Sequence, residues 1–226
     1  MAERIIIGLG TGRCGTNSLQ HMLDRLAETK ITHEILPVNE ASWIPSPKYF
    51  NKICSYFDNL EYEIAGDIAF YYLPYFYLFK ERYEHIKFIG LKRDKQAVVE
   101  SYLKKTATRN HLSFPNNDFE DFRWDIKYPK FYDMPKEKAL GSYYDLYYGE
   151  LFYLQDLFPK QVRVFDIEDL NSIAGVKKIF KFLNLPLDRI EDSFVSVHEN
   201  SIDVTPIGII KRGKFKSEIK RLLRRI

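Results

Sequence analysis

The sequence predicts an α/β fold in which a central parallel β-sheet is flanked by helices on both faces. Two observations lead to this prediction. Short apolar runs rich in β-branched residues alternate along the chain with segments whose apolar residues recur at helical spacing. The first apolar run, residues 5–7, also leads directly into a glycine-rich turn. A continuous apolar run that meets such a turn is typical of a buried parallel strand.

Each expected element follows from its own local pattern. Strands are expected at the apolar runs in residues 5–7, 31–35, 64–69, 86–91 and 162–167. Helices are expected where apolar residues repeat at i, i+3, i+4 and i+7, in residues 19–26, 72–83, 96–106, 140–154, 176–183 and 219–226. Residues 37–60 are rich in proline and aromatic residues and should form a loop with a helix.

Length and composition narrow the class of protein. A chain of 226 residues fits a single domain covering residues 1–226, with the polar and aromatic residues 107–135 as an excursion or lid. A hydrophobic share of 45% indicates a globular chain, and a net charge of +3 is too small to indicate nucleic-acid binding. Cys14 and Cys54 offer neither a disulfide framework nor metal-ligand spacing, which fits a reducing compartment. Without a recognisable signal peptide or membrane anchor, we expect a cytoplasmic protein.

The turn after the first strand is the strongest chemical signal. Residues 8–18 read GLGTGRCGTNS and lead into a helix. Glycines let backbone N–H groups turn inward, and a helix N-terminus adds unsatisfied donors and a favourable dipole. Arg13 places a fixed positive charge beside this turn, and Thr16, Asn17 and Ser18 supply further donors. The pattern predicts an anion-binding loop.

Several anions are compatible with a loop of this kind. An ATP or GTP loop is disfavoured because Thr16 stands where its lysine should be. A dinucleotide fingerprint is met formally by Gly10, Gly12 and Gly15, with Glu34 about where an acid would bind a ribose. An NAD(P)-binding Rossmann-type oxidoreductase therefore stays open as an alternative, as does a non-catalytic nucleotide-binding protein.

Residues 11–18 also resemble the 5′-phosphosulfate loop of the sulfotransferase family. That loop has a basic residue, a small residue, Gly, Thr and a second hydroxyl or polar residue, and here Asn17 takes the place of the usual second Thr. The resemblance implies a P-loop NTPase-like sulfotransferase fold and the cofactor 3′-phosphoadenosine 5′-phosphosulfate (PAPS), whose product is adenosine 3′,5′-bisphosphate (PAP). The loop residues that it implies for cofactor binding are Gly12, Arg13, Cys14, Gly15, Thr16, Asn17 and Ser18.

Later segments extend the resemblance. The family binds the 3′-phosphate with an Arg at a strand end and a Ser eight residues on, and Arg93 and Ser101 have that spacing. An arginine can bind phosphate through a fork of charge-assisted hydrogen bonds. Residues 162–170 and 182–186 resemble a structural strand and helix of the family. The segment Lys211, Arg212 and Gly213 resembles its basic glycine loop, which closes over the 3′-phosphate.

The resemblance implies in-line transfer of a sulfuryl group to a hydroxyl or amine of a small-molecule or carbohydrate acceptor. Arg13 is expected at the leaving phosphate and the bridging oxygen. The candidates for the general base lie at the expected carboxyl ends of strands: Glu34 first, His33 second and Asp67 third. Aromatic residues that could stack on an acceptor are Trp43, Tyr71, Tyr72, Tyr75 and Trp124.

Overall fold

The computed structural model describes residues 3–36, 42–106, 111–114 and 126–190. Its centre is a five-stranded, fully parallel sheet with the strand order β2-β3-β1-β4-β7. The strands are β1 (Arg4–Leu9), β2 (Thr29–His33), β3 (Ile64–Ile68), β4 (Ile86–Lys92) and β7 (Val162–Asp166). The predicted α/β class with a central parallel sheet is therefore confirmed.

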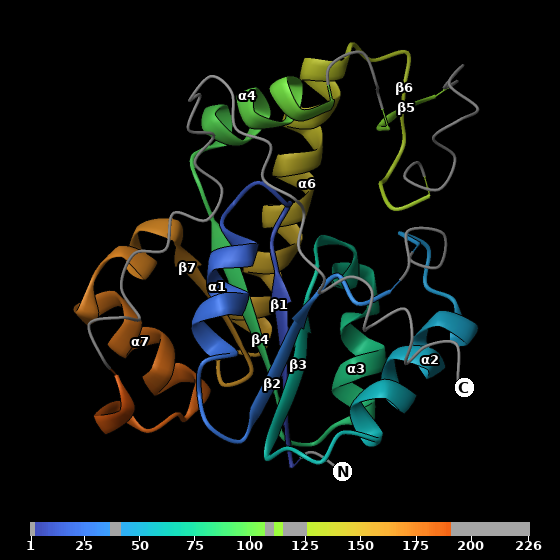
Figure 1. Ribbon diagram of the computed structural model, residues 1–226. Coiled ribbons are helices and arrows are strands. Elements are labelled where there is room, and N and C mark those ends of the chain that lie inside the picture. Colours follow the sequence, from blue (N-terminus) through green and yellow to red (C-terminus); the bar gives the residue numbers. More distant parts are fainter. Residues whose placement is uncertain (1–2, 37–41, 107–110, 115–125, 191–226) are drawn as a thin grey trace, which may run out of the picture.

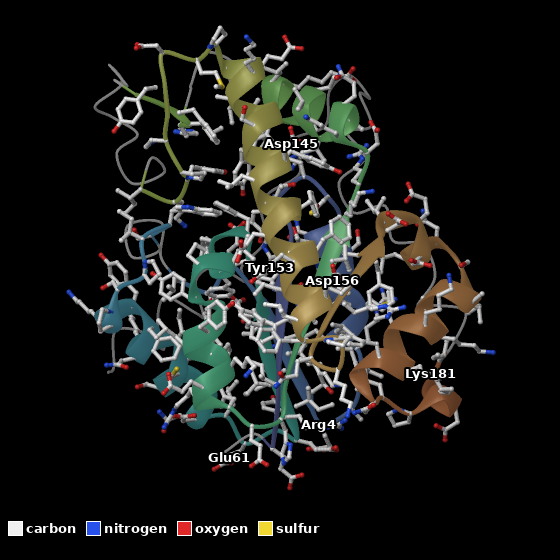
Figure 2. All side chains as sticks on the ribbon, turned by 180° about the vertical axis from the view of Figure 1, so that it is seen from behind. Arg4, Glu61, Asp145, Tyr153, Asp156 and Lys181 are labelled. Atoms are coloured by element: carbon white, nitrogen blue, oxygen red, sulfur yellow. The ribbon has the colours of Figure 1, made fainter. Side chains whose placement is uncertain are left out.

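Helices connect the strands and cover the sheet. They are α1 (Thr16–Leu23), α2 (Pro47–Asp58), α3 (Phe76–Arg82), α4 (Lys95–Thr106), α6 (Lys136–Leu157) and α7 (Ile173–Leu183), with 3₁₀ turns η1 (Phe70–Tyr75), η3 (Ile167–Asn171) and η4 (Leu187–Arg189). Figure 1 shows α1 in front of the sheet and α6 behind it, and Figure 2 shows α6 from the other side. Both views place α4 beside the upper part of α6, beyond the end of the strands.

The central position of β1 follows from its composition. Five of its six residues are buried, because β3 and β4 pair with it on either side and helices cover both faces. Gly66 of β3 allows the close approach on one side, since a Cβ there would lie 2.0 Å from the carbonyl oxygen of Ile6. The chain leaves β1 for β2 and β3 on one side and returns to β4 on the other. Ligands of open α/β sheets bind beyond the carboxyl ends of the strands at such a reversal.

Three predicted segments differ from the observed ones. The helix predicted in residues 72–83 is the 3₁₀ turn η1, which contains Pro74, followed by the shorter α3. The second strand spans Thr29–His33 rather than residues 31–35, and its buried residues, Thr29 and Ile31, alternate with half-buried ones as expected at the edge of a sheet. Within the predicted excursion, β5 (Ser113–Phe114) and β6 (Phe131–Tyr132) form a short parallel pair that the residue pattern did not indicate. The helical stripe predicted in residues 219–226 lies outside the described residues.

Aromatic side chains fill much of the core. Phe76 of α3 packs on Phe88 of β4 with ring centroids 4.4 Å apart, and Phe57 and Phe79 are fully buried nearby. Across the described residues, none of the helices has the length and apolar character needed to cross a membrane.

Candidate active site

The loop between β1 and α1 has an unusual backbone. Gly12, Arg13 and Gly15 have φ angles of 80°, 60° and 92°, all in the left-handed region. Glycine adopts this region freely, whereas a side chain such as that of Arg13 adds a strain of about 1–2 kcal/mol. Strained non-glycine residues concentrate at functional sites. The conformation turns the loop around the N-terminus of α1, for which Gly15 is the N-cap residue.

The side chains of the loop divide between its two sides. Cys14 is fully buried beneath the loop, and a Cβ at Gly10 would lie 2.5 Å from its sulfur. Thr16 is mostly buried, whereas Asn17 and Ser18 are partly exposed in the first turn of α1. The first N–H groups of a helix have no partner within the helix. The rim of the loop therefore combines backbone donors with polar side chains, as an anion site requires.

Tyrosines of α6 and α4 fix the other side of the loop. The N–H of buried Gly10 donates to the hydroxyl oxygen of Tyr147 at 2.9 Å. The carbonyl oxygen of Thr11 accepts hydrogen bonds from the hydroxyl of Tyr143, at 3.3 Å, and from that of Tyr102. The backbone groups on this side of the loop are thus satisfied by the protein itself.

Arg13, Arg93 and Ser101 come together at the mouth of the loop. Arg13 Nε donates to Ser101 Oγ at 2.9 Å, and Arg93 Nη1 donates to the carbonyl oxygen of Arg13 at 3.3 Å. Within the described ranges, neither guanidinium is paired with a carboxylate. Two partly exposed arginines without an acidic partner make this a site suited to an anion with more than one charge.

The end of β4 and the adjoining Arg93 are tied to α6 by further tyrosines. The hydroxyl of Tyr144 donates to the carbonyl oxygen of Arg93 at 2.6 Å, and that of Tyr148 donates to the carbonyl oxygen of Leu91 at 2.6 Å. One face of α6 therefore positions both the glycine loop and the end of β4. This arrangement fixes the distance between Arg13 and Arg93.

His33 is the last residue of β2, and Glu34 follows it at the carboxyl edge of the sheet. His33 Nε2 is 3.1 Å from Thr16 Oγ1, which places the ring against the first turn of α1. Burial lowers the pKa of His33, against a smaller opposing effect of Asp67, so its ring is neutral at pH 7. Glu34 follows with a φ of 51°, and its N–H donates to the carbonyl oxygen of Ile68 at 3.1 Å.

Asp67 is fully buried and surrounded by donors. Its oxygens accept from the hydroxyls of Thr32, at 2.7 Å, and Tyr72, at 2.6 Å, and from the N–H of Ile35 at 3.2 Å. Burial raises the pKa of Asp67, and these hydrogen bonds oppose the effect. The carboxyl group ties the end of β2 to β3 and so positions His33 and Glu34.

Lys127 and Tyr128 lie beside the loop's surroundings although no motif indicated them, since the Tyr128 hydroxyl is 3.5 Å from that of Tyr102, which bonds to Thr11. Only 1% of Lys127 is exposed, and its Nζ lies 4.5 Å from the centroid of the Tyr71 ring. Tyr128 stacks on Phe70 with ring centroids 4.8 Å apart. A lysine in a polar and aromatic segment normally predicts an exposed side chain, so the sequence offers no local signal for this burial.

Some of the remaining predicted residues lie within the described part of the chain, and others lie outside it. Tyr72 and Tyr75 are core residues, whereas Trp43 is partly exposed and packs on Tyr143 and Tyr147 at 5.9 and 6.1 Å between centroids. The others lie outside the described residues, namely Trp124, Lys211, Arg212 and Gly213.

Solved structures share this architecture. The crystal structure of a sulfotransferase from Alicyclobacillus acidocaldarius aligns with a TM-score of 0.56 at 20% sequence identity, over 87% of each chain. The chain has the sulfotransferase fold. Mouse sulfotransferase SULT7A1, solved in complex with PAP, aligns with a TM-score of 0.51 at 15% identity, over 86% of this chain and 62% of the mouse chain. No protein-family model matches the sequence, and a search of curated proteins finds no match.

The sulfotransferase fold also decides between the architectures that the glycine pattern left open. A Rossmann domain has the strand order 3-2-1-4-5-6, with the second strand beside the first. Here β3 lies between β2 and β1. The spacing of Gly10, Gly12 and Gly15 therefore matches the dinucleotide fingerprint only formally, and the Rossmann alternative is wrong at the level of the fold.

Proposed function

We propose that the protein is a PAPS-dependent sulfotransferase, which transfers a sulfuryl group to a hydroxyl or amine acceptor. The observation that supports it most directly is the meeting of Arg13, Arg93 and Ser101 beside the left-handed loop. The fold similarity supports the reaction class but leaves the acceptor open. We expect a small molecule or a carbohydrate, because aromatic residues border the carboxyl ends of β2 and β3.

The residues present fit a doubly phosphorylated nucleotide. A Cβ at Gly12 would lie 2.5 Å from the hydroxyl of Tyr102, so the backbone needs glycine there to keep its turn. Arg13 and Arg93 approach from different elements, and Ser101 of α4 contacts the Arg13 side chain. An anion with more than one phosphate group is a natural ligand for two guanidinium groups carried by different rigid elements.

The assigned roles follow the two ends of the cofactor. Residues 12–18 would hold the 5′-phosphosulfate, with Arg13 at the bridging oxygen on which negative charge develops. Arg93 and Ser101 would hold the 3′-phosphate, joined by Lys211, Arg212 and Gly213. When bound, PAPS supplies an activated sulfuryl group whose leaving group is a phosphate oxygen of PAP.

Glu34 is the proposed general base, and it would accept the proton of the acceptor hydroxyl. His33 is the second candidate, since its ring is neutral at pH 7 but already contacts Thr16. Asp67 is the least suitable because its oxygens accept three hydrogen bonds in the core.

Ligand-induced stabilisation tests the cofactor. PAP at about 100 times its dissociation constant should raise the free energy of unfolding by about 2.7 kcal/mol, and NAD⁺ or ATP at equal concentration should not. Arg93→Ala should abolish the PAP effect, whereas Arg163→Ala, which removes an exposed arginine of β7, should preserve it. Stabilisation by NAD⁺ alone would overturn the proposal.

Turnover tests the chemistry separately. PAPS with a panel of phenols, amines and sugars should yield PAP, and Glu34→Gln should lower this rate while PAP binding is retained. Full activity of Glu34→Gln would place the base elsewhere. PAP binding without turnover on any acceptor would favour the alternative of a non-catalytic nucleotide-binding protein.

A further inference from the structure

His33 and Thr16 form a hydrogen-bonded pair between the end of β2 and the first turn of α1. His33 Nε2 lies 3.1 Å from Thr16 Oγ1, and Thr16 is the first helical residue after the N-cap Gly15. Among the described residues, neither of these two side chains makes another hydrogen bond. The direction of the Thr16 O–H bond is therefore set by this ring and by the anion that the loop holds.

Further contacts along one face of α1 hold the pair at this distance. Gln20 Nε2 donates to the carbonyl oxygen of Ile31 at 2.7 Å, and Asp24 Oδ1 accepts from the N–H of Ile31 at 2.9 Å. Thr16, Gln20 and Asp24 are spaced four residues apart, so their side chains lie on the same face of the helix. The helix is thus fastened to β2 along its whole length, and the contact of His33 with Thr16 is one end of this row.

Two arrangements of protons fit the distance between His33 and Thr16, because a neutral imidazole carries its proton on one nitrogen or the other. If Nε2 of His33 is bare, it accepts the hydroxyl proton, and Thr16 Oγ1 presents only lone pairs to the loop. If Nε2 is protonated, it donates to Thr16 Oγ1, and the hydroxyl proton is available to an anion. Because an anion accepts hydrogen bonds and repels lone pairs, it selects the second arrangement.

We propose that His33 is a positioning residue of the anion loop, which donates from Nε2 to Thr16 and so directs the threonine hydroxyl proton at the bound anion. This role rests on the proposed function in one respect, namely that residues 12–18 hold the 5′-phosphosulfate of the cofactor. Nε2 of His33 then serves the cofactor end of the site, and the proton of the acceptor is left to Glu34.

An anion in the loop should also draw a second proton onto the ring of His33. The titratable groups that act on this ring are Asp67 of β3, which raises its pKa, and His21 of α1, which lowers it, and Glu34 follows it in the chain. An imidazolium also donates from Nε2 and adds a positive charge, so a bound anion raises the pKa of His33. By linkage, the loop should bind an anion more tightly as the pH falls through the range in which His33 takes up this proton.

NMR of the ring nitrogens tests the arrangement directly, in the full chain carrying ¹⁵N-labelled histidine. The probe is inorganic sulfate, because it resembles the sulfuryl group and does not titrate near neutral pH. Saturating sulfate should place the proton of neutral His33 on Nε2 and raise the titration midpoint of the ring by about one pH unit. His33→Gln identifies the signal by its loss, and exposed His85, which precedes β4, is the control that should not respond. A bare Nε2 in the sulfate-bound protein would overturn the proposal.

Affinity measurements separate positioning from a merely structural role. PAP affinity, measured by calorimetry, should fall about tenfold in His33→Leu, which has no donor. His33→Gln should restore most of this loss, because its amide also donates. Thr16→Val removes the hydroxyl from a side chain of similar shape, so in that background His33→Leu should cost little more. Equal losses in the two His33 variants, or losses that add fully with Thr16→Val, would contradict the proposed hydrogen bond.

The positioning role and the proposed function can fail separately. If sulfate places the proton on Nε2 of His33 but PAP does not bind, the positioning role stands and the assignment of the nucleotide fails. If PAP binds while neither PAP nor sulfate changes the ring of His33, the positioning role fails and the assignment of the nucleotide stands. Binding of neither anion would overturn both.

Discussion

Tyr147→Phe tests whether α6 sets the shape of the glycine loop. The substitution removes only the hydroxyl that accepts the Gly10 N–H at 2.9 Å, and both residues are buried. The ring and its packing against Trp43 and Tyr143 remain. A buried donor left without a partner costs about 1–3 kcal/mol. We expect the free energy of unfolding to fall by about this amount, which corresponds to about 2–12 °C in Tm for a chain of this size.

The assay is urea denaturation of the variant beside Tyr153→Phe, with PAP titrations on both. Tyr153 lies on the same helix with 55% exposure, so loss of its hydroxyl should change stability by less than about 0.5 kcal/mol (Figure 2). Only Tyr147→Phe should weaken PAP binding, because Gly10 begins the loop. Equal effects of the two substitutions on stability and on PAP affinity would refute the argument that α6 positions the loop.

Two further substitutions test the loop and the histidine. Gly12→Ala should abolish PAP binding, measured by calorimetry, because Gly12 has a φ of 80° and an added Cβ would lie 2.5 Å from the Tyr102 hydroxyl. Gly149→Ala is the control, because an added Cβ there would meet no atom within 4 Å. This variant should bind PAP normally and gain about 0.5–1 kcal/mol in the free energy of unfolding. Burial lowers the pKa of His33 in the folded protein below its ordinary value of 6.5. The contribution of His33 to the free energy of unfolding is therefore complete above about pH 6.5 and is lost as the pH falls through the lowered pKa. His33→Gln should therefore flatten the acid side of the stability curve, and exposed His85→Gln should not.

The sheet was predictable from the sequence because strands buried on both faces need continuous apolar residues. β1, β3 and β4 meet that condition, and their predicted positions agree closely with the structure. The edge strand β2 begins two residues before its prediction, at Thr29, because an edge strand tolerates polar residues. The glycine loop was predictable for a different reason, since its backbone angles are ones that glycine adopts without strain.

The neighbourhood of Arg13 was only partly predictable. Arg93 follows a strand, and Ser101 lies about two helical turns further along the chain. This spacing is enough to predict that the two side chains point the same way, and the structure brings both to Arg13. The burial of Lys127 depends on contacts of residues 126–128 with Trp43, Phe70 and Tyr71, which are more than fifty residues away in the sequence. Such contacts are properties of the assembled fold, and no local pattern encodes them.

The tyrosines of α6 show what an anion loop requires from the rest of the fold. The helical spacing of these residues predicted a buried stripe, for which leucine or phenylalanine would have served equally well. Turning N–H groups toward an anion leaves other backbone groups of the loop and of β4 facing the core, at Gly10, Thr11, Leu91 and Arg93. With leucine or phenylalanine on α6, the groups of Gly10, Leu91 and Arg93 would lose these side-chain partners, at about 1–3 kcal/mol apiece, and Thr11 would keep only Tyr102 of α4. A tyrosine fills the same volume and adds one hydroxyl at its far end, so a tyrosine stripe satisfies these groups while α6 remains a core helix.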